Sequence, residues 1–333
     1  MINNKSNRND NLLFTNSALL LFIFYVIVIT VFSIINPKYM SLLNLRVITS
    51  NISYLGIVVI GQFLVVIAGG FDLSVGSLVG LTSVICVLLL SLHLPVSIVI
   101  LLAILFGTFI GAINGAIYKY LGVNSIVTTL GTASILGGIG IFLANSENFM
   151  RGLPNKERIN DVVFTNFARG YIGKLLPKSF LYTIILFIII WLLLKYTTYG
   201  RSIYYVGGSS QIARIMGINS KFIQFSTFVL SGAFAAFAGI VLAGQLAIGK
   251  PEIGATATIE SLTIVILGGT VISGGKGDVP SVLIAMLIIG SIATGLSLIN
   301  VSIYFRQVIT GLVLVMAMGF NNIKTQGFNV GAI

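Results

Sequence analysis

The chain has 333 residues, of which 56% are hydrophobic and 8% are charged. An ordinary soluble domain has roughly 25% charged residues, so this composition excludes a water-soluble globular surface. The 19 Lys and Arg residues outnumber the 8 Asp and Glu residues, but they stand singly between apolar segments, as cytoplasmic loops and lipid headgroups favour. They form no basic stripe, so we expect a lipid bilayer as partner and no nucleic acid.

The apolar segments are long enough to cross a membrane. One helical crossing needs about 20 mostly apolar residues, and the segments lack the period-2 alternation of barrel strands. The pattern predicts an all-α integral membrane protein, a polytopic bundle of about ten transmembrane helices in a single domain over residues 17–320. The expected crossings are residues 17–35, 52–69, 74–92, 96–118, 125–144, 180–196, 222–243, 258–273, 279–298 and 303–320.

The basic residues predict how the chain is oriented. With the N-terminus inside, nine Lys and Arg residues lie on the cytoplasmic side, and four lie in short outer loops or segment ends, in agreement with the positive-inside rule. Residues 1–16 and 321–333 are then cytoplasmic tails, residues 145–179 an extracytoplasmic loop and residues 197–221 a cytoplasmic loop. The stretch 145–179 contains six basic residues and taken alone would favour the cytoplasm.

A single cysteine and a single histidine leave little material for metal or catalytic sites. Cys86 lies inside an apolar segment, so the chain has no intrachain disulfide and no CxxC motif. His93 stands beside Pro95 at a segment boundary, so the sequence does not favour a His-based metal site or a Ser-His-Asp triad. We expect no catalytic residue, no metal and no cofactor, with an Asp-based or Lys-based intramembrane enzyme as an open alternative.

Two Gly-rich segments interrupt the apolar pattern and resemble each other. Residues 66–76 and 265–275 match at six of eleven positions with an offset of 199 residues, although Gly-rich sequences also match by chance. Paired glycines at corresponding places in two halves indicate broken or re-entrant helices at a transporter's central site, because unwound backbone at membrane depth lines a cavity or is buried in protein. The break residues expected there are Gly69, Gly70, Asp72, Ser74, Gly76, Gly268, Gly269, Gly274 and Gly275.

Asp72 has two open interpretations. A carboxylate at the bilayer centre costs about 2.5–3.5 kcal/mol on insertion scales, so it should face an aqueous path or a partner. Alternatively, Asp72 caps the next helix by accepting from its first backbone N–H groups. Gln62, Asn114 and Thr128 are further candidates for the path, because uncharged polar groups exchange hydrogen bonds with a solute without holding it tightly; packing is the alternative for each.

The second break does not form a phosphate-binding loop. Counting back from the Gly-Lys pair at 275–276, the first glycine of a P-loop would stand at Thr270, and Gly277 takes the place of the magnesium-binding Ser or Thr. Any nucleotide must therefore be bound by another chain. Upstream, Glu260 leaves only residues 261–273 uncharged before the glycines, which is too short to span a bilayer.

A stripe of small residues recurs at four-residue spacing. Gly107, Gly111 and Gly115 share one helical face, and such stripes let helix backbones approach closely in lipid. We interpret the stripe as packing inside the bundle, with a dimerisation face as the alternative.

The loop at 197–221 is short, basic and patterned. After Gly207 and Gly208, Ser209 can cap a short amphipathic helix. Its apolar face needs a cover on the cytoplasmic side, which is either the lipid headgroups or a groove in a partner protein. The residues of this face are Ile212, Ile215 and Met216.

These motifs together resemble the permease subunits of bacterial monosaccharide ABC importers, of the ribose, galactose, xylose and autoinducer-2 type. The matching stretches are residues 70–77, 128–132, 200–218 and 267–277. The resemblance implies a ten-helix permease of the bacterial cytoplasmic (inner) membrane that carries a monosaccharide or similar small polyol and does no covalent chemistry. Its implied partners are ATP-binding subunits that hydrolyse ATP, a soluble extracytoplasmic sugar-binding protein, and a second permease copy in a homodimer or heterodimer.

The resemblance also implies that the loop at 197–221 is the element that couples the permease to the ATPase. The residues so implicated are Arg201, Gly207, Gly208, Ser209, Arg214 and Gly217. The rival interpretation is a secondary transporter driven by protons or sodium. Such a transporter normally needs ionisable residues deep in several helices, and here only Asp72 and Glu260 come close.

Overall fold

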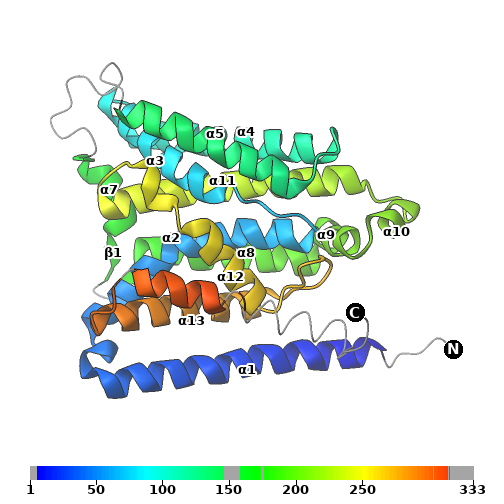
Figure 1. Cartoon of the computed structure of the whole chain (residues 1–333), viewed down its shortest axis with the longest axis horizontal. Helices are drawn as coiled ribbons and strands as arrows, with labels where there is room; N and C mark the ends of the chain where they lie inside the picture. Colours follow the sequence, from blue (N-terminus) through cyan, green and yellow to red (C-terminus); the bar gives the residue numbers. More distant parts are fainter. Residues whose placement is uncertain (1–5, 146–157, 174–175, 303, 314, 316–333) are drawn as a thin grey trace.

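The computed structural model describes residues 6–145, 158–173, 176–302, 304–313 and 315. Figure 1 shows the long helices running side by side, with α1 at one edge of the bundle and α4 and α5 at the opposite edge. The long helices are α1 (Ser6–Ile35), α2 (Leu42–Ile67), α3 (Val75–Ser91), α4 (Val96–Lys119), α5 (Ser125–Asn145), α8 (Lys178–Tyr196), α11 (Ser220–Leu246) and α13 (Val279–Leu298). The shorter elements are α7 (Val162–Arg169), α9 (Thr198–Gly208), α10 (Ser210–Ile215), α12 (Ala257–Leu267), and the 3-10 turns η1 (Pro37–Met40) and η2 (Pro251–Gly254).

Seven helices among the described residues are long and apolar enough to cross a membrane, namely the apolar part of α1 together with α2, α4, α5, α8, α11 and α13. Helix α3 is apolar but has only 17 residues, and α12 has 11. The expected helical bundle of about ten crossings is confirmed, with two of them short because each adjoins a Gly-rich break. The last expected crossing, 303–320, is helical over 304–313 and otherwise lies outside the described residues.

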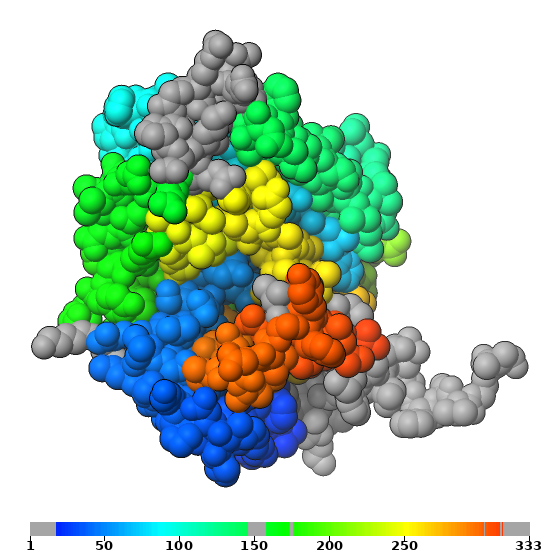
Figure 2. Space-filling model, turned by 60° about the vertical axis from the view of Figure 1, so that its left-hand side comes forward, coloured from blue at the N-terminus to red at the C-terminus, as the bar shows by residue number. Residues whose placement is uncertain are grey.

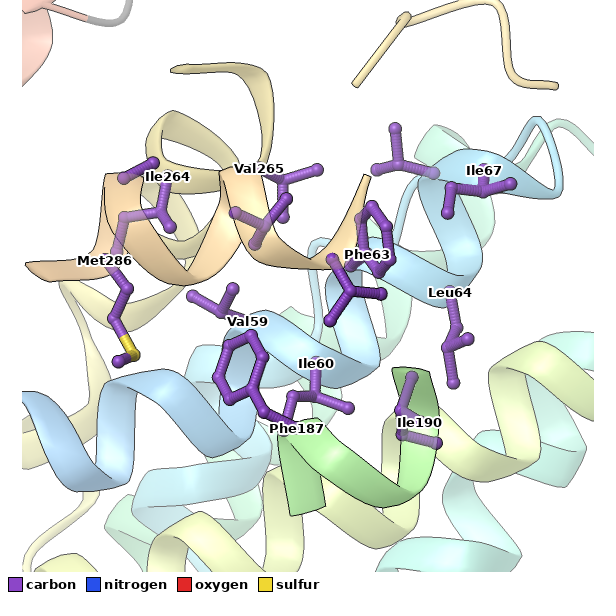
Figure 3. Close-up of a cluster of buried hydrophobic side chains, with 14 of the residues drawn as sticks. Val59, Ile60, Phe63, Leu64, Ile67, Phe187, Ile190, Ile264, Val265 and Met286 are labelled. Atoms are coloured by element: carbon purple, nitrogen blue, oxygen red, sulfur yellow. The ribbon is translucent and has the colours of Figure 1, made fainter. Parts of the chain in front are cut away.

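Helix α2 is the central helix of the bundle. In its apolar window 83% of the residues are buried, against 6% in the window of α1. Phe63 of α2 belongs to a cluster with Phe187 of α8, Val265 of α12 and Met286 of α13 (Figure 3). Because lipid is as apolar as these side chains, close packing holds the helices together. Helix α2 therefore fixes the first break at its own end and, through α12, the second.

Glycines let α4 pack directly on α11. A Cβ on Gly107 would lie 2.4 Å from the carbonyl oxygen of Gly232, and a Cβ on Gly232 would lie 2.1 Å from the carbonyl oxygen of Gly107. Gly111 lies equally close to the backbone of Phe228. The interpretation of this stripe as packing inside the bundle is confirmed.

Two N-terminal boundaries differ from the expected ones. Helix α1 begins at Ser6, so most of the expected tail at 1–16 is helical. Helix α2 begins at Leu42 instead of residue 52 because Ser41 caps it, its Oγ accepting from the backbone N–H of Asn44 at 3.2 Å.

The stretch 145–179 is more structured than a loop. It contains α7 and an antiparallel hairpin of β1 (Tyr171–Ile172) and β2 (Leu176–Pro177), with Ile172 opposite Leu176. Asp161 caps α7 by accepting from the backbone N–H of Phe164 at 2.8 Å. Figure 2 brings this end of the molecule forward and shows the yellow surface around the end of α11 and η2 between green α5 and orange α13.

Candidate translocation site

A cavity of about 390 Å³ lies between α3, α5, η2 and α12. Its volume falls within the roughly 300–1,000 Å³ of small-molecule sites, which are mostly apolar with a few polar groups. Here the polar side chains of the lining are the hydroxyls of Ser77 and Thr258, and no lining residue is charged. The lining residues are Leu73, Gly76, Ser77, Leu130, Gly137, Pro251, Ala255, Thr258 and Ile259.

One wall of the cavity is made by the turn η2 lying on α3. A Cβ on Gly80 would stand 1.9 Å from the carbonyl oxygen of Pro251, and a Cβ on Gly76 would stand 2.6 Å from that of Gly254. Only glycines admit backbone at these separations. The backbone N–H of Gly76 also donates to Thr258 Oγ1 at 3.0 Å, which joins α3 to α12 at the cavity.

The first break is held in an extended form by side chains of α5. The backbone N–H of Phe71 donates to Ser125 Oγ at 3.2 Å, and that of Leu73 donates to Thr129 Oγ1 at 3.0 Å. Buried backbone donors need partners when no helix supplies them. The 128–132 motif therefore stabilises the first break, because Thr129 accepts a hydrogen bond from its backbone. Thr128, the residue expected on the path, directs its hydroxyl to Asn124 of its own chain segment.

Asp72 is 1% exposed and accepts three hydrogen bonds. Its Oδ1 accepts from the backbone N–H of Ser74 at 3.0 Å and from Ser74 Oγ at 2.6 Å, and its Oδ2 accepts from Ser231 Oγ at 2.8 Å. The N-cap residue of α3 is Ser74, and the bond from its backbone to Asp72 forms an Asx turn ahead of the helix. Asp72 thus ties the first break to α11, and it is absent from the cavity lining.

Asn114 extends this tie across the bundle. Its Nδ2 donates to Ser74 Oγ at 2.9 Å, and its Oδ1 accepts from Thr132 Oγ1 at 2.6 Å. A continuous chain of hydrogen bonds therefore joins α11, the first break, α4 and α5. Gln62 is fully buried, and its two amide atoms have no partner among the described residues.

The second break repeats the local geometry of the first. Gly69 and Gly269 both have φ of 81°, a left-handed value that glycine adopts without strain. After α2 the N–H of Gly70 donates to Val65 O at 2.9 Å, and after α12 the N–H of Thr270 donates to Val265 O at 3.2 Å. Gly69 and Gly269 are therefore the equivalent positions, 200 residues apart. The sequence match had an offset of 199 residues because it paired Gly69 with Gly268, which precedes the left-handed glycine.

The second break ends in a carboxylate that the sequence analysis missed. Asp278 caps α13, and its Oδ2 accepts from the backbone N–H of Ser281 at 3.0 Å and from Ser281 Oγ at 2.8 Å. The signal was an Asp followed by Pro280 in the first helical turn, ahead of an apolar run. Each break is thus closed by an Asp that binds a nearby Ser.

The loop at 197–221 folds as two helices. Ser209 caps α10 as expected, its Oγ accepting from the backbone N–H of Ile212 at 3.3 Å. Gly217, with φ of 81°, ends the turn after α10, and the side chains of Arg201 and Arg214 are exposed. The apolar face of α10 is also exposed, most of all Ile215 at 86%.

Helix α9 was not expected. Gly207 and Gly208, taken as a break before α10, form its last turn. Gly207 lies against Ile67 and Gly275, whereas Gly274 lies against Gly69. Of the glycines expected to line a path, Gly69, Gly274 and Gly275 therefore lie where α9 meets both breaks. Of the predicted break residues only Gly76 lines the cavity.

Comparison with known proteins agrees with this architecture. The family described as "Branched-chain amino acid transport system / permease component" matches residues 44–318. The chain belongs to this permease family. Among its relatives, the ribose import permease protein RbsC of Haemophilus influenzae is 33% identical over 301 residues, which are 90% of this chain and 92% of that protein. The autoinducer 2 import system permease protein LsrD of Salmonella typhimurium is 30% identical over 293 residues, 87% and 86% of the two chains.

RbsC of Escherichia coli K12 is also 30% identical, over 301 residues that cover 90% of this permease and 92% of that protein. No solved structure matches the permease significantly. The resemblance to importer permeases is thereby confirmed, and with it the expectation of a multi-pass membrane transport subunit instead of an enzyme. The relatives support this interpretation and not that of an ion-coupled secondary transporter.

The cavity lining of the permease could not have been predicted in full. Gly76 and Ser77 belong to a recognised motif, but Pro251, Ala255 and Ile259 reach the cavity only because η2 folds onto α3. The one available signal was the pair of glycines, Gly76 and Gly80, four residues apart on one helical face.

Proposed function

We propose that this permease is the transmembrane subunit of an ATP-driven importer for a monosaccharide or a similar small polyol. The cavity beside the first break carries this proposal, because hydroxyls, backbone and apolar groups line it without any charge. Such a lining suits a neutral polyhydroxylated solute that must bind weakly and leave. The 33% identity to a ribose import permease supports the same class of solute.

ATP hydrolysis belongs to partner subunits that dock on α10. The exposed apolar residues of α10 have no cover among the described residues, and Ile215 is the most exposed of them. Arg214 of α10 and Arg201 of α9 are exposed as well. An amphipathic helix of this kind fits a hydrophobic groove in a partner protein.

From docking of the ATPase at α10 we infer the topology. Helices α9 and α10 then lie in the cytoplasm and, with the expected crossings, both termini lie on the cytoplasmic side of the bacterial inner membrane. The excess of Lys and Arg on that side supports this orientation. The opposite end, with α7 and the hairpin, then faces outward, where a soluble sugar-binding protein docks.

A second permease copy, identical or not, completes the path. The outward face of α5 carries Gly131 and Gly138, where an added Cβ would meet no atom within 4 Å. The same helix contributes Leu130 and Gly137 to the cavity. Small residues allow close helix contact in lipid, so a second copy seated on α5 would close the cavity from the side.

Reconstitution tests the proposal. The permease is incorporated into proteoliposomes together with ATP-binding subunits and a sugar-binding protein of the same organism, and uptake of labelled ribose and autoinducer 2 is measured with and without ATP. Uptake is expected to need ATP, both partner proteins and the permease. Uptake by the permease alone along a proton or sodium gradient would refute the importer.

A further inference from the structure

Glycines of α9 and of both breaks meet backbone to backbone at the C-terminal end of α2. A Cβ on Gly207 of α9 would lie 1.7 Å from the carbonyl oxygen of Ile67 and 2.6 Å from the backbone nitrogen of Gly275. A Cβ on Gly274 would lie 2.9 Å both from Gly207 O and from the Cα of Gly69. The last turn of α9 is therefore wedged between the first and the second break with no side chain in between.

A hydrogen bond joins the two breaks directly at this point. The backbone N–H of Gly275 donates to the carbonyl oxygen of Ile67 at 2.8 Å. The last carbonyls of a helix lack partners within the helix. Here the two carbonyls that follow Ile67, those of Ala68 and Gly69, also accept hydrogen bonds, from side chains of other helices. Gln224 Nε2 of α11 donates to Ala68 O at 2.7 Å, and Tyr118 of α4 donates to Gly69 O at 3.2 Å.

Helix α9 also holds the second break through a side chain. The hydroxyl of Tyr204 donates to the carbonyl oxygen of Gly277 at 3.1 Å. One turn of α9 thus contacts the first break by close packing and the second by both packing and a hydrogen bond. The neighbouring Tyr205 is exposed.

We propose that Gly207 and Tyr204 are the positioning residues through which movement of α9 and α10 reaches both broken helices at once. The inference rests on the proposed function, which makes α10 the contact with the ATPase. Close-packed backbone transmits displacement because it has little compressibility. A shift of α9 by about 1 Å would also break the Tyr204 hydrogen bond, since such bonds weaken steeply with distance and angle.

A matched pair of glycine variants provides a test. Gly207→Ala places a Cβ against Ile67 O, whereas a Cβ on Gly311, which lies outside α9 and both breaks, has no neighbour within 4 Å. The full importer is reconstituted with each variant, and solute uptake and ATP hydrolysis are measured in the same vesicles. For Gly207→Ala, uptake per ATP is expected to fall about tenfold while the ATPase stays bound, because overpacking at a rigid site displaces backbone. For Gly311→Ala the ratio is expected to equal that of wild type.

A second pair of variants adds no volume. Tyr204→Phe removes the hydroxyl that holds the second break and is expected to lower uptake per ATP several-fold, whereas Tyr205→Phe leaves it unchanged. This pair decides the question if Gly207→Ala is not recovered as folded protein. Equal uptake per ATP in wild type, Gly207→Ala and Tyr204→Phe would overturn this inference but would leave the proposed function intact. Wild-type uptake without the ATPase would overturn the proposed function and this inference with it.

Discussion

Replacing Asp72 by Asn should destabilise the permease, because every group that is hydrogen-bonded to the Asp72 carboxylate is a donor. Ser74 donates twice and Ser231 once to its two oxygens. An amide keeps one oxygen but turns an NH₂ group toward a donor, and loss of one bond to a charged group costs about 1.5–3 kcal/mol. We expect Asp72→Asn to lower the free energy of unfolding by about 2–3 kcal/mol.

Thermal denaturation in detergent, followed by loss of the monodisperse peak, measures this effect. At about 2 °C per kcal/mol for a chain of this size, the midpoint should fall by about 4–6 °C. Asp161→Asn is the control, since Asp161 caps α7 and Asn caps a helix equally well. In the Asp72→Asn background, Ser231→Ala should add little, because residues of one network are not additive. Equal midpoints for Asp72→Asn and wild type would show that the three bonds do not stabilise the fold.

Three further predictions concern the surface and the coupling helices. Ile215→Asp should abolish co-purification of the ATP-binding subunits without changing thermal stability. Ile172→Asp at the opposite end should leave both co-purification and thermal stability unchanged. Co-purification retained in Ile215→Asp would exclude α10 as the docking helix. Gly138→Leu should reduce cross-linking between permease copies, and undiminished cross-linking would remove α5 from the interface. Burial, reinforced by the negative charge of Asp278, raises the pKa of Tyr204 above its ordinary value of 10, so its stabilising contribution is complete below about pH 10 and is lost as pH rises further. Wild type should therefore lose stability between about pH 10 and 12 more steeply than Tyr204→Phe, and parallel denaturation curves would contradict this.

Hydropathy predicted the helices well because length and apolar content are local properties. The short α12 was foreseen from Glu260 and the glycines after it. The start of α2 was placed too late, since Arg46 was read as part of the outer interface although Ser41 already caps the helix. Helix α9 was missed because Gly207 and Gly208 are poor helix formers, and only tertiary packing at the breaks explains their presence in a helix.

The site was predictable in its parts but not in its assembly. The sequence analysis singled out Asp72, Ser74 and Asn114, and the structure joins all three in one chain of hydrogen bonds. Nothing local indicated that Ser231, which lies 159 residues from Asp72, would complete it. Similarly, a contact such as Gly80 with Pro251 depends on how distant segments approach, which single-sequence patterns do not encode.

Helix α1 is shallowly buried and lies apart from the cavity and the two breaks. The family match begins at residue 44, inside α2, and α1 packs on α13 through contacts such as Phe32 against Gly295. The cavity, both breaks and the glycine contacts of α9 with the breaks are all built from residues beyond α1. Helix α1 therefore lies between α13 and lipid, apart from the cavity and both breaks, and covers the Gly295 face of α13 with Phe32.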